Sequence, residues 1–209
     1  MSTAPNLISE VCSAVLVGGK SRRLGKEKSL IPLAGKPLID WVLESLSQVF
    51  ARIILVGRKN PELEKRAELI EDLFPGLGPI SGIYTALEYL KKPVFICACD
   101  MPFLNPRLIR YQVSLLNDFD VVVPCPGGFF EPLHSIYTPA CLKPLKELIE
   151  KGKRRPVEIF PCLRVRKITE KELASYDPQF LPFFNINTYE DLKQAEKILQ
   201  NKFYSFKKY

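Results

Sequence analysis

The sequence predicts an α/β protein, a three-layer sandwich in which helices cover both faces of a mainly parallel, twisted sheet. Two observations support this prediction. Short runs rich in Val and Ile alternate along the chain with stretches of helical periodicity. Pro37, Pro79, Pro106 and Pro139 stand where helical patterns begin, and a missing N–H costs nothing there. Strands and helices that alternate at this spacing form βαβ units, which build parallel sheets.

Seven strands and six helices are expected, in the order of the chain. The strands are expected at 11–17, 52–57, 69–71, 93–98, 120–124, 130–137 and 163–168. The helices are expected at 37–50, 61–67, 79–90, 106–117, 139–150 and 188–200. We expect a single domain over residues 1–209, with a core at 11–198 and a basic tail at 201–209.

The composition is that of an ordinary globular chain, with 46% hydrophobic and 25% charged residues. No run approaches the roughly 18 apolar residues of a membrane helix, and the N-terminus lacks the pattern of a signal peptide. We therefore expect a cytoplasmic protein with no membrane partner. Six dispersed cysteines form no C-x-x-C pair, which disfavours a zinc or redox site and favours free, buried thiols.

The net charge of +7 favours an anionic partner. Nucleic acid, a membrane surface, a phosphorylated small molecule and a merely solvated lysine-rich surface are all compatible with the charge alone. The cations are densest at 20–28, next to a glycine pair, and a second cluster lies at 151–155. Nucleic-acid binding predicts basic residues interleaved with exposed aromatics, whereas this placement favours a phosphorylated small molecule.

The stretch L-V-G-G-K-S-R-R-L-G-K-E-K at 16–28 follows the first expected strand. Glycines there allow backbone N–H groups to approach an anion closely, so the stretch could hold a phosphate or be only a surface loop. It is not a Walker A loop, because five residues rather than four separate Gly19 from Gly25 and Glu27 follows Lys26. There is also no G-x-G-x-x-G pattern.

Other candidates also follow expected strands, where ligands bind in open α/β sheets. Asp100 ends the strand at 93–98, and a carboxylate there suits Mg²⁺ or else forms a turn or caps a helix. Gly76, Gly78 and Gly82 permit close approach by a flat base or a ribose, or merely form a tight connection.

The remaining candidates are a histidine and two asparagines. His134 is the only histidine, and a lone histidine is more often structural than catalytic when no Ser or Cys needs its activation. Asn185 and Asn187 share one face if their segment is extended, ahead of a helix that Thr188 could cap.

Taken together, these segments resemble the nucleotidyltransferases that attach a nucleotide to the molybdenum cofactor. The pattern L-x-G-G-x-S-x-R-x-G-x-x-K is matched by Leu16, Gly18, Gly19, Ser21, Arg23, Gly25 and Lys28. Further matches are G-K-P-L at 35–38, G-P-I-S-G at 78–82, C-D-M-P at 99–102, E-P-L-H-S-I-Y at 131–137 and F-x-N-I-N-T at 183–188. The doubled glycine resembles the guanylyl branch, since cytidylyl enzymes tend to carry Ala-Gly.

The resemblance spans about residues 11–198 and implies a Rossmann-like fold of the nucleotide-diphospho-sugar transferase type. It implies transfer of GMP from GTP to molybdopterin carrying molybdenum, release of pyrophosphate, and Mg²⁺ as cofactor. The expected partners are these two small molecules and, transiently, cofactor assembly or acceptor proteins, in a monomer or weak oligomer. Rival functions are CTP transfer to the pterin, NTP transfer to a sugar phosphate, and a catalytically silent adaptor.

The resemblance also implies roles for individual residues. Guanine and ribose would lie against Leu16, Val17, Gly18 and Gly19, with Asp72, Gly78 and Gly82 also at the nucleotide. Catalysis would rest on Arg23, Lys28 and Asp100, with Lys28 at the phosphates and Asp100 binding Mg²⁺. The metal and pterin side would include Asn185 and Asn187, and His134 is a further substrate candidate. Apart from the resemblance, the density of cations after the Gly152 turn favours docking of the phosphate or dithiolene end of the pterin by Lys153, Arg154 and Arg155, or else these residues form a solvated helix end.

Two positions depart from the family pattern. The family can carry an asparagine after its second strand, where this chain has V-G-R at 56–58. The backbone of Gly57 is therefore the candidate contact there. Position 17 is Val where Ala is usual, a small change close to the base.

Overall fold

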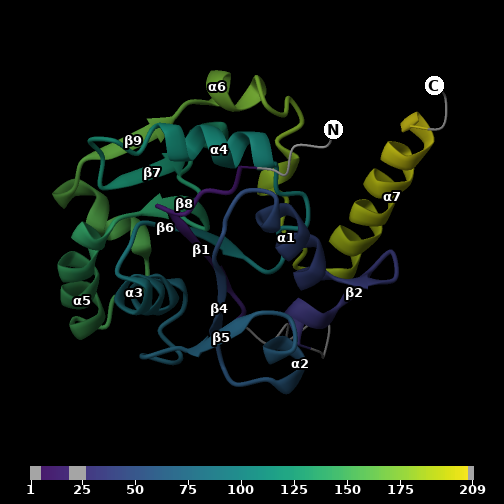
Figure 1. Ribbon diagram of the computed structural model, residues 1–209. Coiled ribbons are helices and arrows are strands. Elements are labelled where there is room, and N and C mark those ends of the chain that lie inside the picture. Colours follow the sequence, from purple (N-terminus) through teal and green to yellow (C-terminus); the bar gives the residue numbers. More distant parts are fainter. Residues whose placement is uncertain (1–5, 19–26, 207–209) are drawn as a thin grey trace.

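The computed structural model describes residues 6–18 and 27–206. A seven-stranded sheet forms the middle layer, with the strand order β5-β4-β1-β6-β8-β7-β9 (Figure 1). Its strands are β1 Cys12–Leu16, β4 Ile53–Gly57, β5 Glu68–Glu71, β6 Val94–Ala98, β7 Val121–Pro124, β8 His134–Tyr137 and β9 Val165–Ile168. All seven expected strands are present, and the expected fold class is confirmed.

The directions of five strand pairs show which strands end at the same edge of the sheet. The neighbours β5, β4, β1 and β6 are parallel, so their carboxyl ends share one edge. β8 runs antiparallel to both β6 and β7. The chain leaves β1 for β4 on one side and returns to β6 on the other, so the strand order reverses at β1, which is where open α/β sheets bind ligands.

Helices cover both faces of the sheet. They are α1 Leu38–Ser47, α2 Pro61–Glu64, α3 Pro79–Leu90, α4 Pro106–Ser114, α5 Leu142–Glu150, α6 Glu170–Ala174 and α7 Tyr189–Phe206. α3 and α5 pack together on one face, while α1 and α4 cover the other (Figure 1). Successive side chains of β1 point to opposite faces of the sheet. Ala14 belongs to the core under α3, and Val15 belongs to the core under α1.

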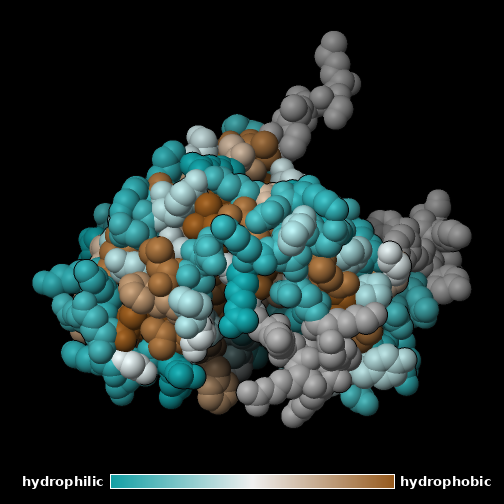
Figure 2. All heavy atoms as spheres, turned by 90° about the horizontal axis from the view of Figure 1, so that it is seen from below, coloured by the Kyte–Doolittle hydropathy of each residue, from teal (hydrophilic) through white to brown (hydrophobic). Residues whose placement is uncertain are grey.

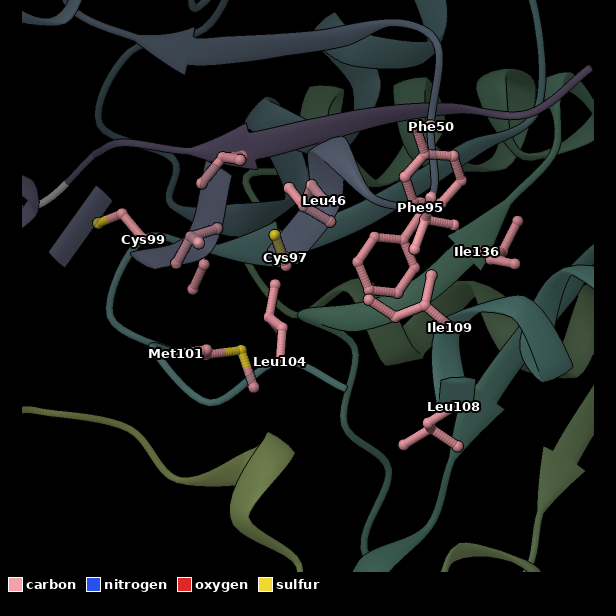
Figure 3. Packing of buried hydrophobic residues seen from close by; sticks show 14 of the residues in the cluster. Leu46, Phe50, Phe95, Cys97, Cys99, Met101, Leu104, Leu108, Ile109 and Ile136 are labelled. Carbon is pink, nitrogen blue, oxygen red and sulfur yellow. The ribbon is translucent and has the colours of Figure 1, made fainter. Parts of the chain in front are cut away.

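The core between the sheet and α1 is built around aromatic residues. The Phe50 and Phe95 rings stack with their centroids 5.7 Å apart, and Leu46 of α1 and Ile109 of α4 belong to the same cluster (Figure 3). On the outer face shown in Figure 2, hydrophilic residues predominate and hydrophobic residues form smaller areas between them.

Several expected boundaries were wrong. Pro37 lies in β3 Lys36–Pro37, which pairs with β2 Pro32–Leu33 in a hairpin that the sequence reading missed. Pro139 begins a 3₁₀ turn rather than α5. The strand expected at 130–137 starts only at His134, because a turn closes there, with the His134 N–H donating to Glu131 O at 3.2 Å. α7 runs to Phe206, so the expected tail is partly helical.

Helix α6 was not predicted either, although the sequence contains a signal for its N-terminus. Thr169 caps this helix, and its hydroxyl oxygen accepts from the Glu172 N–H at 3.4 Å. The Glu172 carboxylate in turn accepts from the Thr169 N–H at 2.8 Å. This T-x-x-E capping box stabilises a helix too short for a periodicity search to detect.

All six cysteines are free thiols, and Cys12, Cys97, Cys99 and Cys141 are buried. Burial raises the pKa of Cys99 to about 12, so its thiol stays protonated at neutral pH and is a poor nucleophile. No helix in the described part of the chain is long and apolar enough to cross a membrane.

His134 lies in the core, where its ring packs edge-on against Phe95, with centroids 5.1 Å apart, and against Phe183 at 5.0 Å. It is completely buried, and neither ring nitrogen has a hydrogen-bond partner among the described residues. Burial lowers the pKa of this imidazole to about 4, so the ring is neutral and acts as a packed, nearly apolar group.

We expect His134 to make the protein less stable in mild acid. The unfolded chain binds a proton below about pH 6.5, whereas the folded protein does not until about pH 4. The free energy of unfolding therefore falls across this window by roughly 1.4 kcal/mol per pH unit. Urea denaturation between pH 7.5 and 4.5 measures it, with His134→Leu as the comparison.

The His134→Leu variant should show a flatter dependence on pH in the same window. Burial raises the pKa of Glu131, so that carboxyl group acts with the opposite sign, but it is present in both proteins and cancels in the comparison. Equal slopes for the two proteins would show that His134 is not buried as a neutral ring.

Candidate functional site

A cavity of about 1140 Å³ opens at the carboxyl ends of β1, β4, β5 and β6. Hydrogen bonds continue past the strands and fix the residues that follow them. The Cys99 N–H donates to Leu16 O at 3.3 Å, and the Asp72 N–H donates to Gly57 O at 3.0 Å. The cavity brings together Leu16, Val17, Gly18, Lys28, Gly57, Asp72, Gly78, Gly82, Asp100, Asn185 and Asn187.

Glycines line one end of this cavity. At two of them, a larger residue would clash with the neighbouring chain. A Cβ at Gly82 would lie 2.8 Å from Leu16 Cδ2, and one at Gly57 would lie 3.0 Å from the Val17 carbonyl oxygen. Both glycines thus let β1 pack closely against β4 and α3. Gly18, which also lines the cavity, differs, since a Cβ there would meet no atom of the described residues within 4 Å.

We expect alanine at Gly18 and at Gly57 to have opposite effects. Gly57→Ala should lower the free energy of unfolding by roughly 1–3 kcal/mol, the usual cost of overpacking. Gly18→Ala should leave stability within about 0.5 kcal/mol but weaken nucleotide binding about tenfold, or about 1.4 kcal/mol. Urea denaturation and calorimetric titration with GTP measure the two effects, and a Gly18→Ala variant as unstable as Gly57→Ala would contradict this assignment.

Asp72 organises the loop that closes the glycine end. Its Oδ1 accepts from the Phe74 N–H at 3.1 Å, from the Thr85 hydroxyl at 3.3 Å and from the Ser81 hydroxyl. Ser81 and Thr85 are buried on the first turns of α3. The loop at 72–78 is therefore held to α3 by this carboxylate oxygen and by two direct bonds, from the Leu73 N–H to the Thr85 hydroxyl oxygen at 3.1 Å and from the Phe74 N–H to the Ser81 hydroxyl oxygen at 3.2 Å.

Charged and amide groups form the other end of the cavity. Lys28 Nζ pairs with Asp100 Oδ2 and donates to Asn187 Oδ1 at 2.8 Å. The side chains of Lys28 and Asp100 are only 16% and 11% exposed, so solvent screens their attraction less than at an open surface. Asn185 also faces the cavity, and its amide donates to Phe183 O at 3.2 Å.

The oxygen atoms at this end suit a hard divalent cation. Asp100 Oδ1 is buried and has no hydrogen-bond partner among the described residues, although a buried carboxylate oxygen normally has one. Carboxylate and amide oxygens are the ligands that Mg²⁺ prefers, and it needs only one or two carboxylates when phosphates and waters complete its shell. No cluster of three or more His, Cys, Asp or Glu exists among the described residues, so a cation here would have few protein ligands, and the carboxylate oxygen without another described partner is that of Asp100.

Three candidates do not belong to this cavity. His134 is completely buried, which rules out contact between its ring and a substrate and corrects that expectation. Arg154 and Arg155 are exposed beyond the end of α5 and do not line the cavity, so their docking of the pterin stays a prediction. Gly19 and Arg23 lie outside the described residues.

The lining residues that were not predicted from the sequence include Arg58, Pro75 and Leu133. Arg58 follows β4 directly, and residues that follow a parallel strand are expected near the ligand site. Leu133 lies in the matched motif at 131–137, but nothing in the local sequence indicates that the turn before antiparallel β8 brings it to the cavity.

A glycine-lined cavity at the reversal point of a parallel sheet, with a lysine, a carboxylate and amides at its far end, defines an α/β protein that binds a phosphorylated nucleotide. The chain belongs to the family of the MobA-like NTP transferase domain, whose model matches residues 13–164.

Relatives extend this likeness over most of the chain. A probable molybdenum cofactor guanylyltransferase of Pelotomaculum thermopropionicum is 33% identical and is aligned over 92% of this chain and 95% of its own length. A molybdenum cofactor guanylyltransferase of Desulfosudis oleivorans is 35% identical, over 91% and 96%. The crystal structure of molybdopterin-guanine dinucleotide biosynthesis protein A from Archaeoglobus fulgidus is 34% identical, with a TM-score of 0.80 over 93% and 100%.

Proposed function

We propose that this protein transfers GMP from GTP to molybdopterin that carries molybdenum, releasing pyrophosphate. The observation that carries the proposal is the arrangement of Lys28, Asp100 and Asn187 at one end of a cavity whose other end is lined by glycines. The relatives' names agree with it. The reaction belongs in the cytoplasm, with only transient contact to assembly or acceptor proteins.

The cavity orders the nucleotide from base to phosphates. Guanine and ribose lie against Leu16, Val17 and Gly18 and below the loop that Asp72 holds. The triphosphate extends toward Lys28, whose ammonium group lies at the carboxyl end of β6 beside Asp100. Asn187 accepts from this ammonium group, and Asn185 and Asn187 both line the cavity, where the acceptor would meet them.

The reaction requires positioning and charge neutralisation rather than an activated nucleophile. A terminal phosphate oxygen of the pterin is already anionic and attacks the α-phosphorus of GTP in line. The new P–O bond forms as the bond to the β-phosphate oxygen breaks, and pyrophosphate leaves with that electron pair. Lys28 offsets the negative charge of the triphosphate during this step. This is consistent with a site that has no Ser-His or Cys-His pair among its described residues.

Asp100, with Asn187 beside it, would hold Mg²⁺. The orphaned oxygen of Asp100 supports this assignment. Bound Mg²⁺ would neutralise charge on the triphosphate and orient it. The chain's own part is to present these oxygens in a partly buried position.

A thermal-shift comparison tests the choice of nucleotide. GTP with Mg²⁺ should stabilise the protein, by roughly 2.7 kcal/mol at 100 times its Kd, whereas CTP and ATP should do so much less. A product assay with molybdopterin and each nucleotide follows. Robust transfer from CTP without transfer from GTP would point to the cytidylyl reaction, and transfer to a sugar phosphate would point to that class of transferase.

A further inference from the structure

We propose that Asp191, in the first turn of α7, is a positioning residue that holds Asn187 in place and thereby keeps Lys28 beside Asp100. Asp191 does not line the cavity and acts only through its neighbours. The consequence for GTP binding rests on the function proposed above, whereas the arrangement of side chains does not.

The first part of the argument is the pair of hydrogen bonds that Asp191 accepts. Its Oδ2 accepts from the Asn187 N–H at 2.9 Å and from the Thr188 N–H at 2.8 Å. The Asp191 N–H donates to the Thr188 hydroxyl oxygen at 3.1 Å. The bonds between Thr188 and Asp191 form an ordinary helix cap, but the bond to Asn187 reaches one residue further, into the site.

The second part is that Asn187 is also fixed from its other side. The Ile186 N–H donates to the backbone oxygen of Asp100 at 3.0 Å. Ile186 is completely buried in a cluster that includes Leu38 of α1 and Leu192 of α7. With Ile186 anchored before it and Asp191 after it, Asn187 presents its amide oxygen to Lys28 Nζ at 2.8 Å.

The third part is electrostatic. The N–H of Asn187 is the main cause that lowers the pKa of Asp191, and the positive charge of Lys28 lowers it further. Asp191 is therefore deprotonated at neutral pH, and its Oδ2 is free to accept from both N–H groups. Without this carboxylate, Asn187 loses a backbone partner, and Lys28 loses the fixed position of the second oxygen that it binds.

Three variants separate positioning from helix capping. Asp191→Ala removes the carboxylate and with it the bonds from the Asn187 N–H and the Thr188 N–H together, while the bond from the Asp191 N–H to the Thr188 hydroxyl can remain. Thr188→Ala weakens the cap of the same helix, by an amount typical of cap substitutions, but leaves the Asp191 bond to Asn187 in place. Asp191→Asn keeps an oxygen that can accept both bonds, because both go to a single atom of Asp191.

The first measurement needs no ligand. Competitive acetylation of each protein, followed by mass spectrometry, reports how accessible the Lys28 amine is. In Asp191→Ala the rate at Lys28 should rise several-fold relative to an unaffected lysine such as Lys65, while Thr188→Ala and Asp191→Asn should keep the rate of the unsubstituted protein. An unchanged rate in Asp191→Ala, or an equal rise in Thr188→Ala, would overturn the proposal.

The second measurement is the affinity for GTP in the presence of Mg²⁺. Asp191→Ala should weaken it about tenfold, the equivalent of about one hydrogen bond, with Asp191→Asn close to the unsubstituted protein. Loss of affinity in Thr188→Ala equal to that in Asp191→Ala would reduce Asp191 to a capping role. If the unsubstituted chain binds no GTP, the proposed function fails, and the acetylation rates still decide the role of Asp191.

Discussion

Asp100→Asn should lower kcat by about 10²–10³, the loss typical when one preorganised charge-stabilising group is removed from an active site. The amide has nearly the shape of the carboxylate but no charge, so it forms no ion pair with Lys28 and binds a divalent cation more weakly than the carboxylate does. The fold should persist, because the Ile186 N–H binds the backbone oxygen of Asp100 rather than its side chain.

The matched control is Asp120→Asn. Asp100 and Asp120 are 7% and 9% exposed, and each is paired with a cation, Lys28 for the first and Arg164 for the second. Asp120 lies at the start of β7 and outside the cavity, so its variant should lose stability but keep its turnover. Steady-state rates together with urea denaturation separate the two outcomes.

The metal assignment has its own test in the same variant. Mn²⁺ titrated in the presence of GTP and followed by electron paramagnetic resonance should bind the unsubstituted protein and bind Asp100→Asn much more weakly. A variant that keeps more than a tenth of the turnover and binds Mn²⁺ normally would show that Asp100 is not the metal ligand.

Lys28→Met is the second large effect that we expect. The ammonium group lies in the cavity beside Asp100 and Asn187, and methionine has a side chain of similar length without the charge. A hydrogen bond to a charged group contributes about 1.5–3 kcal/mol, so kcat/KM for GTP should fall by roughly 10–10². The loss should lie mainly in the affinity for the triphosphate.

Lys65→Met provides the comparison for Lys28→Met. It removes the same charge from the protein, but Lys65 follows α2 and pairs with Glu62 at 2.7 Å. The two variants therefore change the net charge equally and differ only in where the positive charge is removed. Equal losses of kcat/KM would mean that the overall positive charge, rather than the ammonium group in the cavity, attracts the nucleotide.

The local sequence predicted the elements whose signals are local. The helix over 79–90 was predicted with both ends correct, because Pro79 opens it and its apolar residues follow the helical period. The strands at the centre of the sheet were found because their buried runs are rich in Val and Ile. The predictions were wrong where contacts between segments of the chain decide the structure, as in the β2–β3 hairpin and at the start of β8.

The candidate site was predicted unevenly, for the same reason. Motif resemblance selected Lys28, Asp100 and Asn187, but nothing in the local sequence says that they touch. Their contacts span 72 and 159 positions, and only the folded chain brings them together. His134 shows the converse: its motif pointed to the substrate, and the packing of Phe95 and Phe183 placed it in the core.

By itself, the sequence determined the fold class and the kind of chemistry. Hydrophobic periodicity sets which faces must be buried, and residue types set which groups can bind phosphate or a metal. Only the tertiary structure decided which of these groups share a cavity and which do not. A parallel sheet brings the carboxyl ends of distant strands to one edge, so Lys28 meets Asp100 there, while Asp191 joins the site only because the start of α7 is anchored to that same edge.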